Sequence, residues 1–231
     1  MLKINPEEFK DWNERMITKY DPDAFHHHSN PFIRFVEKRR VKTIFNMMTI
    51  QPEDSVLEVG CGAGNVIERA SSGKLFGVDL STSILRKAKR QINRNILLFQ
   101  GDAQNLPCKN QGFQHVICSE VLEHVLDPLS VLSEISRILT PRGVAILSIP
   151  NESWINGIKR ILIRLRIFNL FMDRQGGYQQ MPERMDEEWH LHSFRLGEWL
   201  NMVTRFFRVT RLKRVPFTWL PLRYVIRLQK Q

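Results

Sequence analysis

The chain has 231 residues, of which 34 are Lys or Arg and 24 are Asp or Glu, giving a formal net charge of +10. This length suits one sizeable core, so we expect a single domain, and the positive charge makes acidic partners plausible. Three scattered cysteines, Cys61, Cys108 and Cys118, exclude a disulfide framework and favour a reducing compartment.

The first 50 residues predict two helices. Residues 6–20 form an amphipathic pattern, and residues 32–48 a longer one with Phe32, Phe35, Val36 and Ile44 on its inner face. The N-terminus lacks a signal pattern, and no run of eighteen uncharged apolar residues occurs. We therefore expect a cytoplasmic protein that does not span a membrane.

Three consecutive histidines, His26 to His28, lie between these helices. Neighbouring histidines on a loop cannot all turn toward one ion. We expect them to be solvated or to cap a helix.

The chain is organised around the stretch from Val56 to Asn65, an apolar run followed by Gly60, Gly62 and Gly64. The pattern predicts a buried strand, a tight turn and a helix that begins near Asn65. Glycines allow close backbone approach and a helix start offers free N–H groups, which indicates a ligand site. The spacing is not that of a dinucleotide fold, and no Gly-Lys-Ser/Thr ending marks a phosphate loop. The alternative is a turn that only connects strand to helix.

After this turn strands and helices alternate, which predicts an α/β, doubly wound, mostly parallel Rossmann-like sheet. We expect strands at 74–78, 96–99, 114–118 and 144–149. We expect one helix at 81–91, with Ser81 as its N-cap, and another at 129–139. Ligands of such sheets bind beyond the carboxyl ends of the strands. Residues at or near four successive strand ends are Glu58 and Gly60, Asp79, Asp102, and Ser119 with Glu120.

The motif Glu-x-Gly-x-Gly-x-Gly, with Asp79 closing the next strand, resembles the class I S-adenosylmethionine-dependent methyltransferases. Gly-Asp-Ala-x-x-Leu-Pro from residue 101 and Ser-Glu-Val-Leu-Glu-His-Val from residue 119 extend the resemblance over about residues 50–150. The nearest pattern is that of the ubiquinone-biosynthesis O-methyltransferases. The resemblance implies S-adenosylmethionine as cofactor and a seven-stranded sheet whose last strand is antiparallel.

Cofactor contacts follow from this resemblance. Asp79 can accept hydrogen bonds from both ribose hydroxyls, Asp102 is implied to receive the adenine amino group with Ala103 beside it, and Leu80 packs on the ring. Arg34, beside Arg39 and Arg40, is the candidate for the cofactor carboxylate. The predicted cofactor-binding residues are Glu58, Gly60, Cys61, Gly62, Gly64, Asp79, Leu80, Asp102, Ala103, Ser119, Glu120, His124 and Arg34.

Glu120, Glu123 and His124 repeat the Glu-x-x-Glu-His of those O-methyltransferases, some of which bind a divalent ion there. On a helix, Glu120 and Glu123 or His124 would share one face. The same letters occur in relatives without metal, so we favour a structural role beside the cofactor and leave the metal unassigned.

Residues 153–172 contain Lys159, Arg160, Arg164 and Arg166 and no carboxylate. Helical spacing puts an apolar face opposite these cations, which predicts an interfacial helix on an anionic membrane surface. The alternative is a helix that covers the acceptor pocket with a solvated basic back, although the O-methyltransferases are similar in having a membrane-touching insert here. The apolar face is Ile155, Ile158, Ile161, Leu162, Leu165 and Phe168.

The segment 187–194 precedes a helix at 196–203 and strands at 207–212 and 224–228. In this topology the segment returns over the strand ends, so His190, ahead of His192, is the candidate base for the acceptor's proton. The alternative is a histidine packed beside Trp189. The apolar loop 215–222 could add to a membrane face or to a dimer contact.

We therefore expect one domain over residues 1–231, with N-terminal helices at 1–50, a cofactor-binding core at 51–150, a basic insert and acceptor cap at 151–195, and a C-terminal helix and strands at 196–231. The predicted activity is methyl transfer to oxygen of a small, lipophilic or lipid-linked acceptor by a cytoplasmic enzyme peripheral to the inner face of the membrane. The rivals are an RNA-directed methyltransferase, weakened by missing Asp/Asn-Pro-Pro-aromatic motifs, and a catalytically silent cofactor-binding partner subunit. The oligomeric state stays open.

Overall fold

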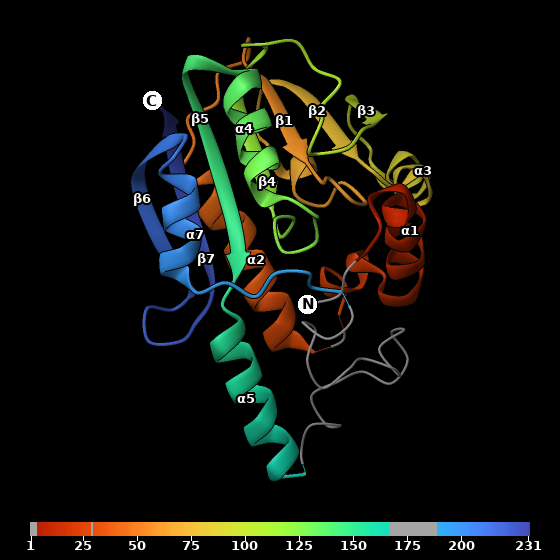
Figure 1. Ribbon diagram of the computed structural model, residues 1–231, viewed down its shortest axis with the longest axis vertical. Coiled ribbons are helices and arrows are strands. Elements are labelled where there is room, and N and C mark those ends of the chain that lie inside the picture. The colour runs from red at the N-terminus through yellow and green to blue at the C-terminus, as the bar shows by residue number, and fades with distance from the viewer. Residues whose placement is uncertain (1–3, 29, 167–188) are drawn as a thin grey trace.

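A computed structural model describes residues 4–28, 30–166 and 189–231 (Figure 1). Its centre is a seven-stranded sheet in the order β3-β2-β1-β4-β5-β7-β6. Strands β1 to β5 pair in parallel, and β7 is antiparallel to both of its neighbours. The predicted fold class and the antiparallel last strand are confirmed.

The seven strands are β1 Ser55–Val59, β2 Lys74–Asp79, β3 Ile96–Gln100, β4 Phe113–Ser119, β5 Leu139–Pro150, β6 Phe207–Pro216 and β7 Pro221–Lys230. The α-helices of the described residues are α1 Phe9–Tyr20, α2 Pro31–Phe45, α3 Thr82–Gln91, α4 Pro128–Ile138, α5 Glu152–Arg164 and α7 Leu196–Val203.

Side-chain caps fix where three of these helices begin. The Ser81 hydroxyl accepts the Ile84 N–H at 3.2 Å, which confirms Ser81 as the predicted N-cap of α3. Asn30 and Asp127 cap α2 and α4 in the same way, and a proline occupies the first position of both helices.

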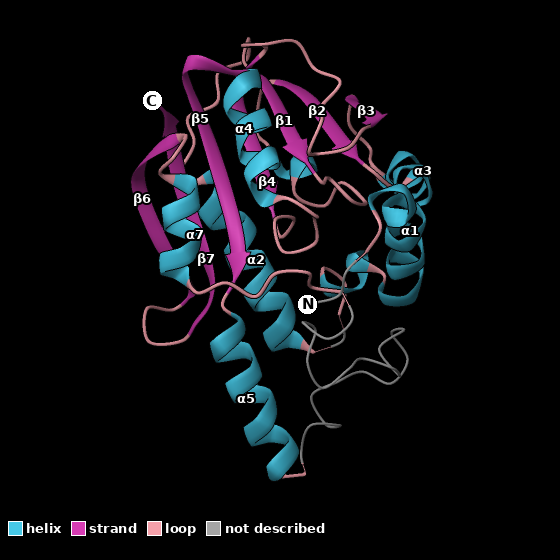
Figure 2. Cartoon of the chain, in the orientation of Figure 1, coloured by secondary structure: helices cyan, strands magenta, loops and turns pink. Residues whose placement is uncertain are grey.

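Helices cover both faces of the sheet (Figure 2). Helices α4 and α7 pack on one face and α2 on the other. Alternation along β4 supplies both layers, because Val116 and Cys118 join the α4 side of the core whereas Ile117 joins the α2 side. Helix α1 instead packs at the strand ends, where Trp12 and Tyr20 meet Trp189.

One predicted helix is wrong, and residues 120–127 are not helical. The helix expected near Asn65 is only a three-residue 3-10 turn at Ile67–Arg69, after which Ala70 is extended. Residues 120–127 form turns, because Glu120 has a positive φ of 56° and Pro128 fixes the start of α4 further along. Glu120 and Glu123 therefore do not share a helical face.

The predicted inner face of α2 is half right. Val36 and Ile44 are buried, but Phe32 and Phe35 are 43% and 41% exposed. The helix turns a charged pair inward instead, because the buried Glu37 and Arg40 bond to each other at the strand ends.

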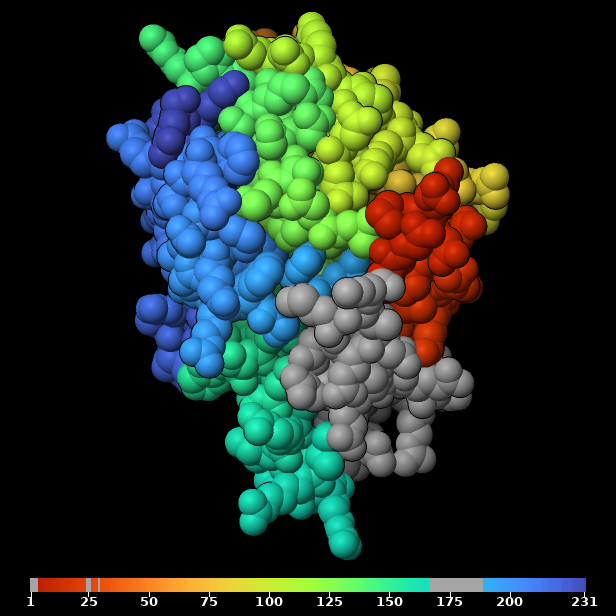
Figure 3. All heavy atoms as spheres, in the orientation of Figure 1, coloured from red at the N-terminus to blue at the C-terminus, as the bar shows by residue number. Residues whose placement is uncertain are grey.

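Helix α5 projects from the carboxyl-end edge of the sheet (Figures 1 and 3). It ends at Arg164, and the predicted continuation through Phe168 to Met172 lies outside the described residues. No helix in the described ranges is both long and apolar enough to cross a bilayer.

Candidate active site at the carboxyl ends of the strands

A cavity of about 420 Å³ lies at the carboxyl ends of β1, β2 and β4. Helices α1, α2 and α5 and the loop at 189–190 complete its walls. Gly64 and Arg34 are not among its described lining residues. The predicted cofactor residues that do line it are Glu58, Gly60, Cys61, Gly62, Asp79, Leu80, Asp102, Ala103, Ser119, Glu120 and His124.

The three glycines of the turn have positive φ, but for different reasons. A Cβ on Gly60 would lie 2.3 Å from Val121 Cγ2, and one on Gly64 would lie 2.4 Å from Ile92 Cδ1. A Cβ on Gly62 would meet no atom within 4 Å. Packing therefore requires Gly60 and Gly64, whereas Gly62 leaves open space at the cavity wall.

Asp79 closes β2 with its carboxylate against the glycine turn. One oxygen accepts the Gly62 N–H at 2.8 Å and the other accepts the Ser81 N–H at 3.0 Å. Burial raises the pKa of Asp79, and these two N–H donors oppose the rise. Each oxygen keeps a lone pair for a ligand hydroxyl.

Glu58 lies beneath the same turn with 2% of its surface exposed. Its carboxylate accepts the Ile67 N–H at 2.9 Å. Burial raises the pKa of Glu58 to about 8, against the opposing effects of the Ile67 N–H and Arg40. Without a ligand, this carboxyl group holds its proton at neutral pH.

Of the three arginines named from the sequence, Arg40 is the one that lines the cavity. Its guanidinium is buried, bonds Glu37 Oε2 at 2.6 Å and reaches the Ser119 hydroxyl. Arg34, the candidate named from sequence, instead donates to the His28 carbonyl at 2.6 Å. The Glu37 and Arg40 spacing of three on α2 was a sequence signal for such a pair.

Asp102 follows β3 and accepts the Gln104 N–H at 2.8 Å, so a local turn fixes its carboxylate at the cavity. His26 also lines the cavity, where burial and Arg40 lower its pKa to about 4. His27 is exposed and His28 is buried. The three histidines therefore occupy different surroundings.

The Glu-x-x-Glu-His segment is divided by its turns. The Glu120 carboxylate accepts the Ser148 hydroxyl at 2.6 Å and pairs with Arg223 at 2.5 Å. Glu123 and His124 instead lie with His190, with one ligand atom of each within 4.8 Å of the others. In the described part of the chain this trio is the candidate cation site. Burial raises the pKa of Glu123 well above its usual range, which favours a neutral acid over a metal ligand.

The two candidate bases, His190 and His192, lie in different surroundings. His190 lines the cavity, and its Nδ1 bonds the buried Glu152 carboxylate at the start of α5. The His124 ring meets His190 edge-on at 4.7 Å, and burial lowers the pKa of His124 well below its usual range. His192 faces elsewhere, with Nε2 at 2.9 Å from the Val125 carbonyl and its ring stacked on Phe194. Sequence reasoning missed Glu152, because 38 residues separate it from its partner.

Comparison with known proteins supports this reading of the fold. Residues 57–147 match a family model described as a methyltransferase domain. Over 96% of this chain and 100% of the other, the fold is similar to that of an S-adenosylmethionine-dependent methyltransferase of Thermotoga maritima, with a TM-score of 0.66 and 19% identity.

Two curated relatives are similar over shorter spans. A demethylmenaquinone methyltransferase of Staphylococcus saprophyticus is 30% identical over 152 residues, which are 62% of this chain and 63% of that protein. A ubiquinone biosynthesis O-methyltransferase of Haemophilus ducreyi is 38% identical over 108 residues, 42% of this chain and 46% of that protein. The chain thus spans about half to two thirds of the length of these relatives. The expected methyltransferase resemblance is confirmed.

Proposed function

We propose that this protein uses S-adenosylmethionine to methylate an oxygen of a small, lipophilic or lipid-linked acceptor. The match of residues 57–147 to a methyltransferase domain supports this cofactor. The observation that carries the proposal is a single cavity that joins the glycine turn and Asp79 to a histidine held by a buried carboxylate. A catalytically silent cofactor-binding subunit would not need the paired histidine and carboxylate.

The residues at the cavity fit S-adenosylmethionine. Gly62 leaves open space for a close approach, and Asp79 keeps acceptor capacity for two hydroxyls. Glu58 supplies a buried carboxyl group near a site that would receive a sulfonium and an ammonium. Bound there, the cofactor supplies a methyl group that the sulfonium already activates.

Apolar side chains form the other side of the cavity. Val36 from α2 and Ile155, Ile158 and Leu162 from α5 line it. Such walls hold an apolar acceptor and exclude water from the reacting atoms. The two curated relatives are named for demethylmenaquinone methylation and for ubiquinone biosynthesis, which supports a quinone-related acceptor class.

We propose that Nε2 of His190 takes the proton from the acceptor. Nδ1 is engaged by Glu152, so Nε2 is the nitrogen left for the cavity. Glu152 positions the ring and stabilises the imidazolium that forms when Nε2 takes the proton. His192 lies outside the cavity lining, which favours His190 of the two candidates.

Membrane contact through α5 is part of the proposal. Ile155, Ile158 and Leu162 of α5 line the cavity, whereas Ile161 of the same helix and Leu165 just after its end are 59% and 60% exposed. Arg160 and Arg164 are also exposed, and each cation near an anionic bilayer contributes about 1 kcal/mol. Helix α5 can therefore both cover the acceptor pocket and lie at a membrane interface.

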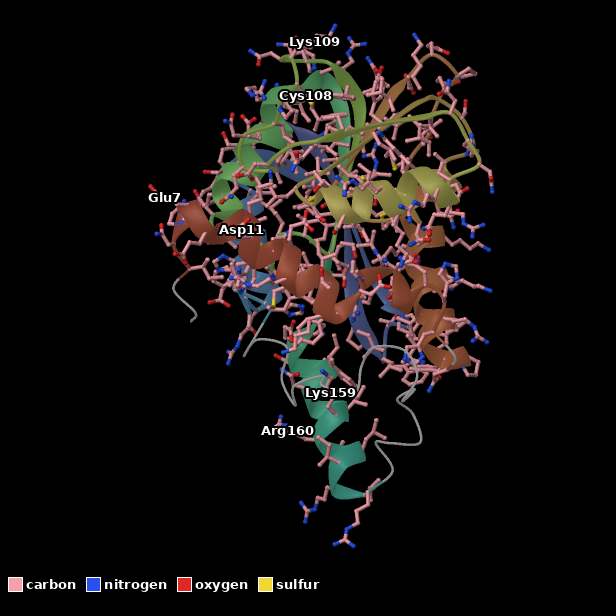
Figure 4. The ribbon with its side chains drawn as sticks, turned by 90° about the vertical axis from the view of Figure 1, so that its right-hand side faces the viewer. Glu7, Asp11, Cys108, Lys109, Lys159 and Arg160 are labelled. Carbon is pink, nitrogen blue, oxygen red and sulfur yellow. The ribbon has the colours of Figure 1, made fainter. Side chains whose placement is uncertain are left out.

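Cofactor binding and product formation test the proposal. Calorimetry should give micromolar S-adenosylmethionine binding that Asp79→Ala weakens at least about tenfold, or about 1.4 kcal/mol. Asp11→Ala, on the exposed side of α1 (Figure 4), is the matched control and should bind normally. Mass spectrometry of a lipid extract incubated with enzyme and isotopically labelled cofactor should then show a labelled, O-methylated lipid. Equal affinity for NAD, or binding indifferent to Asp79→Ala, contradicts the assignment.

A further inference from the structure

Four aromatic side chains, Phe32, Phe35, Phe217 and Trp219, form one surface that we call the aromatic patch. Phe32 and Phe35 belong to α2, and the other two to the tip of the β6–β7 hairpin. The rings of Phe217 and Trp219 stack with centroids 5.1 Å apart, and Phe35 lies 5.7 Å from Phe217. Trp219 is 71% exposed, so the packing within the patch leaves much of it in water.

The aromatic patch borders the opening of the cavity. Phe32 is both partly exposed and part of the cavity lining. The hairpin is also fixed to the start of α5, because the Asn151 N–H donates to the Leu222 carbonyl at 3.0 Å and the Asn151 amide to the Pro221 carbonyl at 2.8 Å. Helices α2 and α5 and the hairpin thus surround one opening.

The exposed charges on α2, α5, β6 and β7 have one sign. In α2, α5, β6 and β7 the only carboxylates are Glu37 and Glu152, and both are buried and paired. Every exposed charged side chain of these four elements is Lys or Arg, as at Lys38, Lys213 and Arg160. Figure 4 shows Lys159 and Arg160 on the projecting helix.

We propose that the aromatic patch is a second membrane anchor, which enters the interface of an anionic bilayer together with α5 and holds the cavity opening against the lipid. Aromatic rings favour the headgroup region, and the surrounding cations favour anionic lipid. The exposed Ile161 of α5 and Leu165 just after its end suit acyl chains better than nucleic acid. Two copies of this cationic face would repel each other, which disfavours a dimer through it.

The proposal rests on the proposed function, because it supplies the route of a lipophilic acceptor. An acceptor dissolved in the bilayer would reach the cavity between α2 and α5 without crossing water. Two anchors beside the opening fix the orientation of the enzyme on the membrane, which α5 alone cannot do.

Tryptophan fluorescence tests the insertion directly. Trp154→Phe removes the other exposed tryptophan, which leaves Trp219 with Trp12, Trp189 and Trp199, the last three at most 8% exposed. Vesicles of phosphatidylglycerol with phosphatidylcholine brominated on its acyl chains should quench Trp219 in this full-length variant. Protein that binds these vesicles with Trp219 unquenched would overturn the proposal.

Flotation supplies the matched comparison. Trp219→Ser should weaken partitioning into phosphatidylglycerol vesicles at least about tenfold, whereas Leu97→Ser, at an apolar site on the opposite sheet edge that is 56% exposed, should change nothing. The proposal fails if Trp219→Ser floats like the wild type, or dissociates a dimer in light scattering, or loses RNA binding while vesicle binding persists. Calorimetry of S-adenosylmethionine binding to the same variants distinguishes the two proposals. If the cofactor binds normally but Trp219 does not insert into vesicles, the membrane anchor is refuted and the proposed methyl transfer is not. If the cofactor does not bind, the proposed function itself is contradicted.

Discussion

Replacing Glu58 by Gln should make the protein more stable in alkali than the wild type. The pKa of Glu58 rises from its ordinary 4.5 to about 8 in the folded state, chiefly through burial. Between these values the folded protein holds one proton that the unfolded chain has released, so stability falls as the pH rises. The stability is fully present below about pH 4.5 and is lost progressively up to about pH 8.

The magnitude follows from the same pKa rise. A difference of about 3.5 between the two pKa values, at about 1.4 kcal/mol each, amounts to about 5 kcal/mol of unfolding free energy. An amide at position 58 has no proton to lose, and its oxygen can still accept the Ile67 N–H that Glu58 accepts at 2.9 Å. The advantage of Glu58→Gln over the wild type should therefore grow with pH.

Urea denaturation from pH 5 to pH 9, followed by circular dichroism without cofactor, measures this difference. Subtracting wild type from variant cancels other titrating groups, such as Asp23 and Glu134 with lowered pKa values. Glu53→Gln, at an exposed turn, is the control and should follow the wild-type profile. Parallel profiles for Glu58→Gln and wild type would refute the reasoning, because they would mean that Glu58 ionises without cost in the folded protein.

Two further outcomes are expected from the geometry of the cavity. Gly60→Ala should lower stability strongly, because its Cβ would lie 2.3 Å from Val121 in addition to the strain of a positive φ. Gly62→Ala should still fold, with only about 1–2 kcal/mol of backbone strain, and should lose cofactor affinity in calorimetry. Equal effects of the two on folding would contradict the open space at Gly62. His190→Gln should reduce turnover about a hundredfold or more with cofactor affinity and melting temperature retained, and Glu152→Gln should shift the pH profile of turnover while His192→Gln leaves it unchanged. An early-melting His190→Gln with normal turnover per folded molecule would make His190 structural.

Much of the fold could be predicted from the chain because its signals are local. Alternating apolar runs gave the parallel strands, and Ser81 marked a helix start that its hydroxyl does cap. The absence of a helix after the glycine turn could not be predicted in this way. The backbone there is fixed by the hydrogen bond from the Ile67 N–H to Glu58 and by three glycines with positive φ, so a tertiary contact and backbone geometry override the helical pattern.

The candidate site was likewise predictable only where local sequence patterns determine it. Gly60, Gly62, Asp79 and Asp102 lie at the cavity because strand ends place them there, which spacing alone indicates. The pairing of His190 with Glu152 could not be read from the sequence, since it joins two segments on either side of the insert. Arg40 was named only beside Arg34, because choosing between them requires the rotation of α2 about its axis.

The sheet order has a consequence for how the chain is made. Strand β7 follows the other six strands in sequence, yet it occupies the interior position between β5 and β6. Until β7 has left the ribosome, β5 presents an open apolar edge and β6 has no partner, so the newly made chain exposes a surface prone to aggregation. In the folded protein Val225, Ile226 and Leu228 of β7 are completely buried. A stop codon that removes residues 221–231 should therefore impair the whole molecule and not just its end.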